Sequence, residues 1–91
     1  MVVKIYVILV YDVGVERVNQ VRVFLKRYLN WIQNSAFEGD LTEGELAQVK
    51  SGLTGLIRES EDSIILFKAS NKRWVEKEII GVEKSKVSTF I

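Results

Sequence analysis

The chain has 91 residues, 47% of them hydrophobic, and a formal net charge of +1, so it is long enough for one domain with a core of its own. It contains no cysteine and no histidine, which excludes disulfides, thiolate chemistry, and imidazole acid–base or metal-ligand roles. No apolar run reaches the roughly 20 residues that cross a bilayer, and no signal-peptide pattern is visible, so we expect a cytoplasmic protein without membrane contact.

The first twelve residues form a run of apolar and β-branched side chains that ends abruptly at Asp12. This composition predicts a strand. Side chains alternate between the two faces of a strand, and beyond Lys4 both faces are apolar, so we expect this strand to be covered on both sides. Because a chain of this length has few helices to cover two faces, a second copy of the protein is a candidate cover for one of them.

Two amphipathic helices are predicted from apolar side chains that recur at spacings of three and four. The first spans about Val15 to Tyr28, and the second spans about Glu43 to Glu59. The second opens with a Thr-x-x-Glu capping box at 42–45, in which each of the two side chains bonds a backbone N–H at the helix start. Gly52 and Gly55 lie inside the second helix and would let it approach a sheet closely.

Further strands are predicted on either side of the second helix. Residues 30–38 resemble a strand with a break near Asn34, followed by a turn at Gly39-Asp40. Ser63 to Ala69 is a strand with two apolar faces. Residues 73–80 are ambiguous between a helical turn and a short edge strand at 78–80, and residues 82–91 form a tail or strand that could pair with a partner subunit.

This order of elements predicts a βαββαβ, ferredoxin-like α+β sandwich with both helices on one face of the sheet. Residues 1–91 then form a single domain. The uncovered apolar face of the sheet must meet something, and a two-fold homodimer is the simplest solution.

Asp12 is the first candidate for chemistry, because a carboxylate at the end of a central strand lies where such folds place functional groups. The alternative is that Asp12 caps the following helix, for which Asp is a favoured residue. Mg²⁺ binds through one or two carboxylates and keeps several waters. A two-fold axis could bring a second Asp12 close, and the pair could hold one Mg²⁺ ion for phosphodiester hydrolysis.

Other candidates each have a structural alternative. Tyr11 and Phe37 could stack on bases, or they could pack in the core or interface. Arg17 could hold phosphate, or it could be a solvated helix residue. Ser35, at the break in the second strand, could bond a ligand or its own backbone. The basic pair Lys72-Arg73 could contact phosphates, or it could be solvated.

Three segments resemble the CRISPR-associated Cas-two family. The first is Tyr11-Asp12-Val13, at the end of the first strand and followed by Arg17. The second is Trp31-Ile32-Gln33-Asn34-Ser35-Ala36-Phe37-Glu38-Gly39-Asp40-Leu41, although Ala36 stands where Val is more usual. The third is Asp62-Ser63, before the last long strand. The resemblance covers nearly the whole chain in the right order.

The resemblance implies ferredoxin-like homodimers joined through their sheets, with the C-terminal segment crossing to the other subunit. It implies a role in CRISPR adaptation, bridging dimers of the Cas integrase and holding a double-stranded DNA spacer. Many members are described as Mg²⁺-dependent nucleases on RNA or DNA, with the metal ligand at the position of Asp12. Arginines early in the first helix of the family match Arg17 or Arg22 loosely, since the double-Arg cluster of some members is missing.

Two interpretations follow from different classes of function. In the first, the protein is a metal-dependent endonuclease on single-stranded RNA or on DNA, in which Asp12 holds Mg²⁺ and Arg17 or Ser35 stabilises phosphate. In the second, it is a scaffold that binds the duplex and the integrase without cleaving. A third alternative is a ferredoxin-like domain that binds a small ligand.

Overall fold

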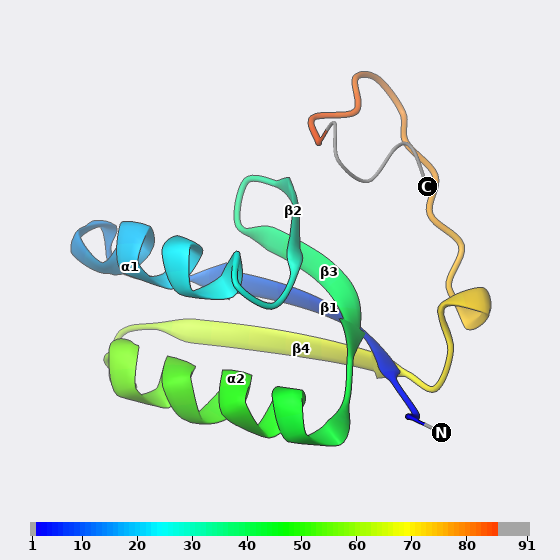
Figure 1. The fold of residues 1–91 in the computed structure, drawn as a ribbon. Coiled ribbons are helices and arrows are strands. Elements are labelled where there is room, and N and C mark those ends of the chain that lie inside the picture. The colour runs from blue at the N-terminus through cyan, green and yellow to red at the C-terminus, as the bar shows by residue number, and fades with distance from the viewer. Residues whose placement is uncertain (1, 86–91) are drawn as a thin grey trace.

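A computed structural model describes residues 2–85 of the chain (Figure 1). The elements in this range are β1 (Ile5–Asp12), α1 (Val15–Leu25), β2 (Asn30–Gln33), β3 (Ala36–Leu41), α2 (Glu43–Leu56), β4 (Ser63–Ala69) and the 3₁₀ helix η1 (Lys72–Trp74). None of the helices within 2–85 is long and apolar enough to span a membrane.

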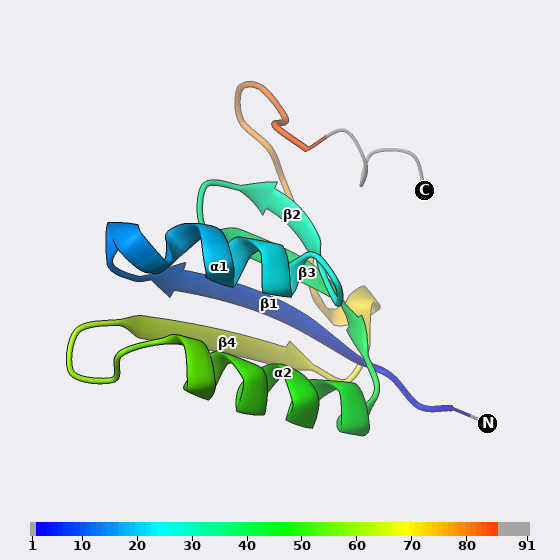
Figure 2. The same cartoon turned by 60° about the vertical axis from the view of Figure 1, so that its left-hand side comes forward.

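The four strands form one sheet in the order β2-β3-β1-β4, and every neighbouring pair is antiparallel. Both helices pack on the same face of this sheet (Figure 2). The predicted βαββαβ, ferredoxin-like arrangement is therefore confirmed. The break predicted near Asn34 is also present as the two-residue turn of the β2–β3 hairpin, where Asn34 has a φ of 43° that asparagine tolerates.

The core lies between the sheet and the two helices. On this side of β1, the side chains of Val7 and Leu9 are fully buried, as is that of Phe37 in β3. The other members of the same cluster come from β1, α1, the turn after α1, β3 and α2: Tyr11, Val21, Leu25, Leu29, Leu41, Leu46, Val49 and Leu53. The periodicity that predicted two apolar helix stripes thus corresponds to real burial against the sheet.

Both helices end earlier than predicted. After Leu25, the N–H groups of Arg27 and Tyr28 bond carbonyls three residues back, so 26–28 form a turn and not a continued helix. After Leu56 the backbone becomes extended at Ile57, and the N–H of Arg58 donates to the Asp62 side chain at 2.8 Å. The bond to the Asp62 side chain replaces the helical one, and the apolar periodicity of a helix does not reveal it.

The turn predicted at Gly39-Asp40 is wrong. Both residues lie inside β3, where Gly39 pairs with Val7 and Asp40 pairs with Tyr6. A Cβ on Gly39 would lie 2.9 Å from the Cδ2 atom of Leu29, so glycine is needed there for close packing.

Gly52 does permit a close approach, but between the helices and not to the sheet as predicted. A Cβ at this position of α2 would overlap the Phe24 ring of α1. Around Gly55 there is open space on all sides, so no close approach occurs there. The predicted contact of these glycines with the sheet is therefore wrong.

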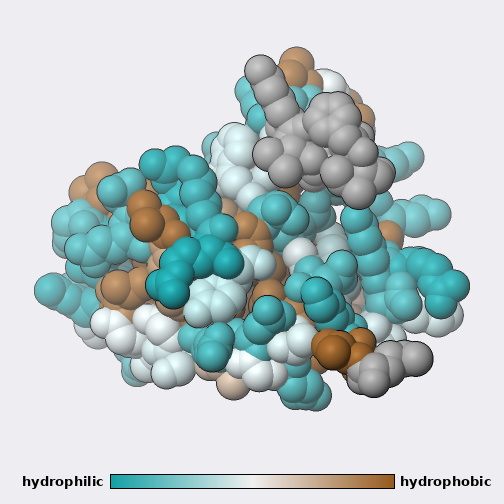
Figure 3. Space-filling model, in the orientation of Figure 1, coloured by the Kyte–Doolittle hydropathy of each residue, from teal (hydrophilic) through white to brown (hydrophobic). Residues whose placement is uncertain are grey.

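Beyond β4 the chain forms η1, which matches the helical turn among the two alternatives, and no strand follows at 78–80. From η1 the chain turns toward the side of the sheet that carries β2 (Figures 1 and 2). In this segment Lys77 forms an ion pair with Glu38 of β3 at 3.2 Å. The tail predicted at 82–91 has no strand through 85, and residues 86–91 lie outside the described range. The molecular face seen in Figure 3 is largely polar, with separate apolar patches.

Candidate functional site

Asp12 is the last residue of β1 and lies between two other segments at one end of the sheet. It pairs with Ser63 of β4, while the N–H of the preceding Tyr11 donates to the carbonyl of Ser35 at 3.0 Å. The Asp12 side chain is exposed, and within residues 2–85 it forms no hydrogen bond or ion pair. Its alternative role as a helix cap is wrong, because Gly14 occupies the N-cap of α1 and no side chain caps it.

Asp12 belongs to the face of the sheet that the helices leave uncovered, which we call the open face. Strand register places Ile8 and Val10 of β1 beside Phe67 and Ile65 of β4 on this face. Val10 is 38% exposed, Ile65 51% and Phe67 56%. The free carboxylate therefore lies at the edge of an exposed apolar surface built from the two neighbouring strands.

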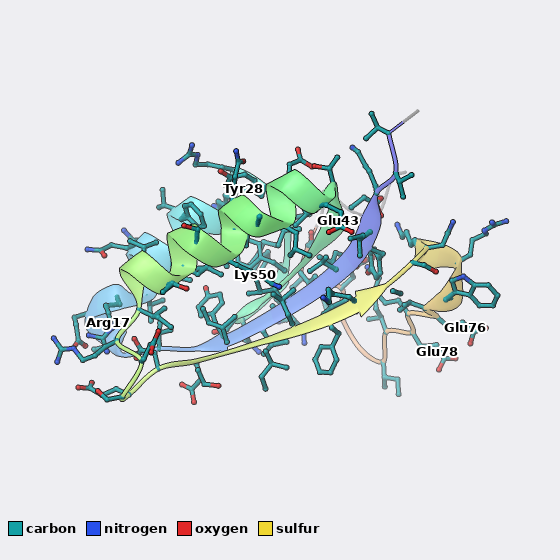
Figure 4. All side chains as sticks on the ribbon, turned by 90° about the horizontal axis from the view of Figure 1, so that it is seen from below. Arg17, Tyr28, Glu43, Lys50, Glu76 and Glu78 are labelled. Atoms are coloured by element: carbon teal, nitrogen blue, oxygen red, sulfur yellow. The ribbon has the colours of Figure 1, made fainter. Side chains whose placement is uncertain are left out.

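A second carboxylate nearby, Asp62, is fully engaged. Its side chain is 0% exposed and accepts hydrogen bonds from the N–H groups of Gly14 at 2.9 Å and Arg58 at 2.8 Å. The Arg17 guanidinium binds both of its oxygens, with Nε at 2.6 Å and Nη2 at 2.9 Å. We call these four residues the Asp62 cluster. Figure 4 shows Arg17 at the end of the sheet where β1 finishes and β4 begins.

The electrostatics of the Asp62 cluster follow from these contacts. The hydrogen bonds from Arg17 are the main reason that the pKa of Asp62 lies well below its usual range, and the backbone donors Arg58 and Gly14 act in the same direction. Arg17 in turn is held charged, with its pKa raised chiefly by Asp62. It also contacts Glu16 at 3.2 Å and Glu61 at 3.3 Å. The guanidinium thus faces carboxylates and is not turned to solvent as a solvated helix residue would be.

The two aromatic candidates for base stacking lie in the core. Tyr11 is 3% exposed and Phe37 is 0% exposed, and their rings stack on each other with centroids 6.2 Å apart. Burial raises the pKa of Tyr11, and a side-chain interaction with Ser35 opposes that rise. Neither ring can stack on a base in this arrangement, so the core alternative holds for both. Ser35 is turned to the Tyr11 side of the sheet, whereas Asp12 lies on the open face.

The basic candidates are separated from Asp12 to different degrees. Arg22 is an exposed residue of α1 that contacts the Asn19 side chain at 3.3 Å, and its charge lowers the pKa of Tyr11. Lys72 and Arg73 are exposed in η1, beyond the far end of β4. The length of β4 alone separates them from Asp12 by about 20 Å. Of the basic candidates, Lys72 and Arg73 therefore lie far from Asp12, whereas Arg17 and Arg22 lie toward the Asp12 end of the sheet.

Sequence reasoning missed a polar cluster on the open face. The Tyr6 hydroxyl donates to Glu38, which is 5% exposed, and Lys77 of the tail binds the other oxygen of that carboxylate at 3.2 Å. Burial and the Glu38 contact raise the pKa of Tyr6. Glu38 interrupts the apolar pattern of its strand, which was the one signal in the sequence.

Side chains that could bind a metal ion together are few in the described residues. Within 2–85 no group of three or more aspartate or glutamate side chains could hold an ion. The exposed, unengaged carboxylate of Asp12 still fits an ion that takes one or two carboxylates and retains several waters, as Mg²⁺ does. A single chain supplies one such donor.

Comparisons with known proteins agree with one another. The family model described as CRISPR associated protein Cas2 matches residues 5–77. A relative from Methanosarcina acetivorans, named CRISPR-associated endoribonuclease Cas2, is 50% identical over 86 residues, which cover 94% of this chain and 99% of the relative. A relative from Archaeoglobus fulgidus, named CRISPR-associated endoribonuclease Cas2 2, is 50% identical over 84 residues, which cover 92% of this chain and 91% of the relative.

A solved structure described as the crystal structure of Cas2 has the same fold. It superimposes with a TM-score of 0.84 at 41% identity and covers 97% of this chain and 99% of the other. The resemblance found in the sequence is therefore confirmed by sequence comparison and by structure. The chain belongs to the CRISPR-associated Cas2 family.

Proposed function

We propose that this protein is an endonuclease of CRISPR adaptation that hydrolyses phosphodiester bonds in RNA or DNA with Asp12 as its central group. The observation that supports this most is the free, exposed Asp12 carboxylate at the end of the central strand. Curated relatives at 50% identity carry the name endoribonuclease, which favours RNA as the first substrate to test.

We further propose that the working form is a homodimer joined through the open face. Ile8, Val10, Ile65 and Phe67 form an apolar surface there that the chain's own helices leave uncovered. Burying it against a second copy would remove that surface from water. Asp12 lies at the edge of the same surface, so a two-fold axis nearby would place two Asp12 carboxylates at one site.

Such a pair of carboxylates suits Mg²⁺, and Asp12 from each copy would hold it. When bound, the ion supplies an easily ionised water and neutralises charge on the phosphate. Asp12 contributes negative charge and an exposed position at a rim where a strand of nucleic acid can approach. The surrounding turn residues restrict its backbone, which keeps the carboxylate oriented toward the open face.

A scaffold function is the second candidate. In it the dimer holds a double-stranded DNA spacer and the Cas integrase without cleaving. The exposed basic side chains of Arg22, Lys72 and Arg73 favour this function, because they are available to phosphates.

The Asp12→Asn variant separates the two functions. Loss of the charge removes the metal donor while the size of the side chain is retained, so we expect RNA cleavage to fall by about 100-fold or more. Asp40→Asn is the matched control, because Asp40 is an exposed aspartate in β3 at the opposite end of β1. It is expected to cleave like the wild type.

Spacer integration by the purified Cas integrase, with each variant added, completes the test. If Asp12→Asn still supports integration but no longer cleaves RNA, the adaptation role depends on the scaffold function and not on cleavage. Wild-type cleavage that persists undiminished in Asp12→Asn would rule out the nuclease proposal.

The homodimer is tested by Phe67→Asp, which places a charge in the middle of the apolar surface of the open face. Because Phe67 is 56% exposed in the single chain, this change leaves the fold of one copy intact. Sedimentation of the variant is expected to show a monomer at concentrations where the wild type is a dimer. A wild type that is already monomeric at these concentrations contradicts the dimer proposal.

A further inference from the structure

We propose that Arg17 and Asp62 are positioning residues that fix the backbone carrying Asp12, and that neither contacts the nucleic acid. The inference rests on the proposed endonuclease function, and it assigns a different role to Arg17 from the phosphate contact that the sequence suggested. It stands on the geometry of the Asp62 cluster, which ties three chain segments together beside Asp12.

Two contacts hold the backbone on either side of Asp12, and both lead to Asp62. Asp12 pairs with Ser63, the residue that follows Asp62. Two residues beyond Asp12, the N–H of Gly14 donates to Asp62 at 2.9 Å. The end of β1 and the turn into α1 are therefore both anchored at one point, which leaves the Asp12 side chain to project without a partner of its own.

Arg17 completes this anchor from the first turn of α1. Its guanidinium makes two hydrogen bonds to Asp62, and the side chain is only 10% exposed. The paired Asp62 side chain is 0% exposed. If Arg17 turned outward to bind a phosphate, it would leave a buried carboxylate without its cation, which is strongly unfavourable.

The same carboxylate shapes the loop that precedes β4. It accepts the N–H of Arg58, where α2 has just ended, and Arg17 reaches Glu61 in the loop at 3.3 Å. Loss of either member of the Arg17–Asp62 pair would therefore release the loop and the β1–α1 turn together. A small displacement of a catalytic group lowers the rate of the chemical step more than it weakens substrate binding.

The two possible roles of Arg17 predict opposite effects of Asp62→Asn. If Arg17 binds phosphate, removing the Asp62 charge frees the guanidinium and tightens substrate binding. If the pair positions Asp12, Asp62→Asn and Arg17→Ala act alike. We expect each variant to lower kcat by about 10- to 100-fold, with KM changed by less than about threefold. The double variant should lose no more than either single one, because the two residues act as a unit.

Amide hydrogen exchange provides a readout that is independent of cleavage. The N–H of Gly14 is expected to exchange at least about tenfold faster in Asp62→Asn than in the wild type, because its acceptor is weakened. Ser60→Ala is the matched control: it removes an exposed hydroxyl from the same loop, at a residue that takes no part in the contacts of Asp62 and Arg17. We expect it to match the wild type in kcat and in Gly14 exchange.

The decisive experiment measures kcat, KM and Gly14 exchange for the wild type, the two single variants, the double variant and Ser60→Ala, with RNA as substrate and Mg²⁺ present. Reduced kcat in both single variants with fast Gly14 exchange supports the proposal. A raised KM in Arg17→Ala together with a normal or lowered KM in Asp62→Asn overturns it. If cleavage by the wild type does not depend on Asp12, the proposed function fails on its own, and unchanged Gly14 exchange would then overturn the positioning role as well.

Discussion

The two faces of the sheet are built from the same strands but are covered in different ways. The face toward α1 and α2 is closed by the chain itself, and Val7, Leu9 and Phe37 are fully buried there. The open face carries Val10, Ile65 and Phe67 at 38%, 51% and 56% exposure. One face therefore determines how stable a single copy is, and the other determines what that copy can join.

Asp12 and Asp62 show the same division at the level of single side chains. Asp62 is buried and bound by Gly14, Arg17 and Arg58, so its role is internal. Asp12, which lies in the adjoining strand one residue out of register, is exposed and has no partner within residues 2–85. Of two acids at one end of the sheet, one is thus held inside the structure and the other is exposed on the open face.

The largest expected difference between the two faces is in how much stability the fold loses in Val7→Ala and in Val10→Ala. Both are valines of β1, but Val7 is 0% exposed and Val10 is 38% exposed on the open face. We expect Val7→Ala to lower the free energy of unfolding by about 2 kcal/mol, from lost burial and a cavity. Val10→Ala should cost less than about 0.5 kcal/mol in dilute protein. Urea unfolding measures both.

Protein concentration makes this comparison sharper. If the open face is buried in a homodimer, the cost of Val10→Ala should grow as the concentration rises above the dimer dissociation constant, while the cost of Val7→Ala stays the same. Equal costs for the two variants in dilute protein would contradict the division of the faces.

A smaller effect is expected within the closed layer, from two glycines of α2. Gly52→Ala would place a methyl group into the Phe24 ring, whereas Gly55→Ala enters open space. We expect Gly52→Ala to destabilise the fold by about 1 kcal/mol, because the overlap outweighs the gain in helix propensity. Gly55→Ala should stabilise it by up to about 1 kcal/mol. Thermal unfolding of the pair shows the sign of each change, and a stabilising Gly52→Ala would contradict the tight helix contact.

Most of the fold could be predicted from the sequence because its signals are local and periodic. The apolar, β-branched runs such as residues 1–12 predicted the strands, the helical stripes predicted the helices, and a family resemblance agreed with their order. The exact helix ends and the place of Gly39 could not be predicted. They depend on Asp62 accepting a hydrogen bond from the N–H of Arg58 and on Leu29 packing against Gly39, contacts that helix and strand periodicity does not encode.

The candidate site was predicted only in part. Asp12 could be singled out because an acid that ends an apolar strand is conspicuous, and its exposure agrees with that choice. The inward orientation of Arg17, Tyr11 and Phe37 was not predictable, because residue type does not tell whether a cation or a ring meets a ligand or the protein's own acids and core. Glu38 was overlooked because its partners, Tyr6 and Lys77, lie 32 and 39 residues away.

The last prediction concerns acid stability and tests the internal role of Asp62. In the unfolded chain this carboxyl titrates near a pKa of about 3.9, whereas in the folded protein its pKa lies well below that. Below about pH 4 the unfolded state therefore binds a proton that the folded state does not, so stability falls as the solution is acidified. Above about pH 5 the contribution of this carboxylate is fully present.

Asp62→Asn removes this titration, so the wild type should be the more stable protein at neutral pH and should lose that advantage progressively between about pH 4 and pH 2.5. Urea unfolding midpoints measured across this range check the expectation. Ser63→Ala is the control, because it changes the next residue and removes no titrating group. Its stability difference from the wild type is expected to stay the same across this pH range. A stability difference between the wild type and Asp62→Asn that stays constant down to about pH 2.5 would mean that Arg17 does not keep the buried carboxylate charged. The contrast with the unpartnered Asp12 would then lose its electrostatic basis.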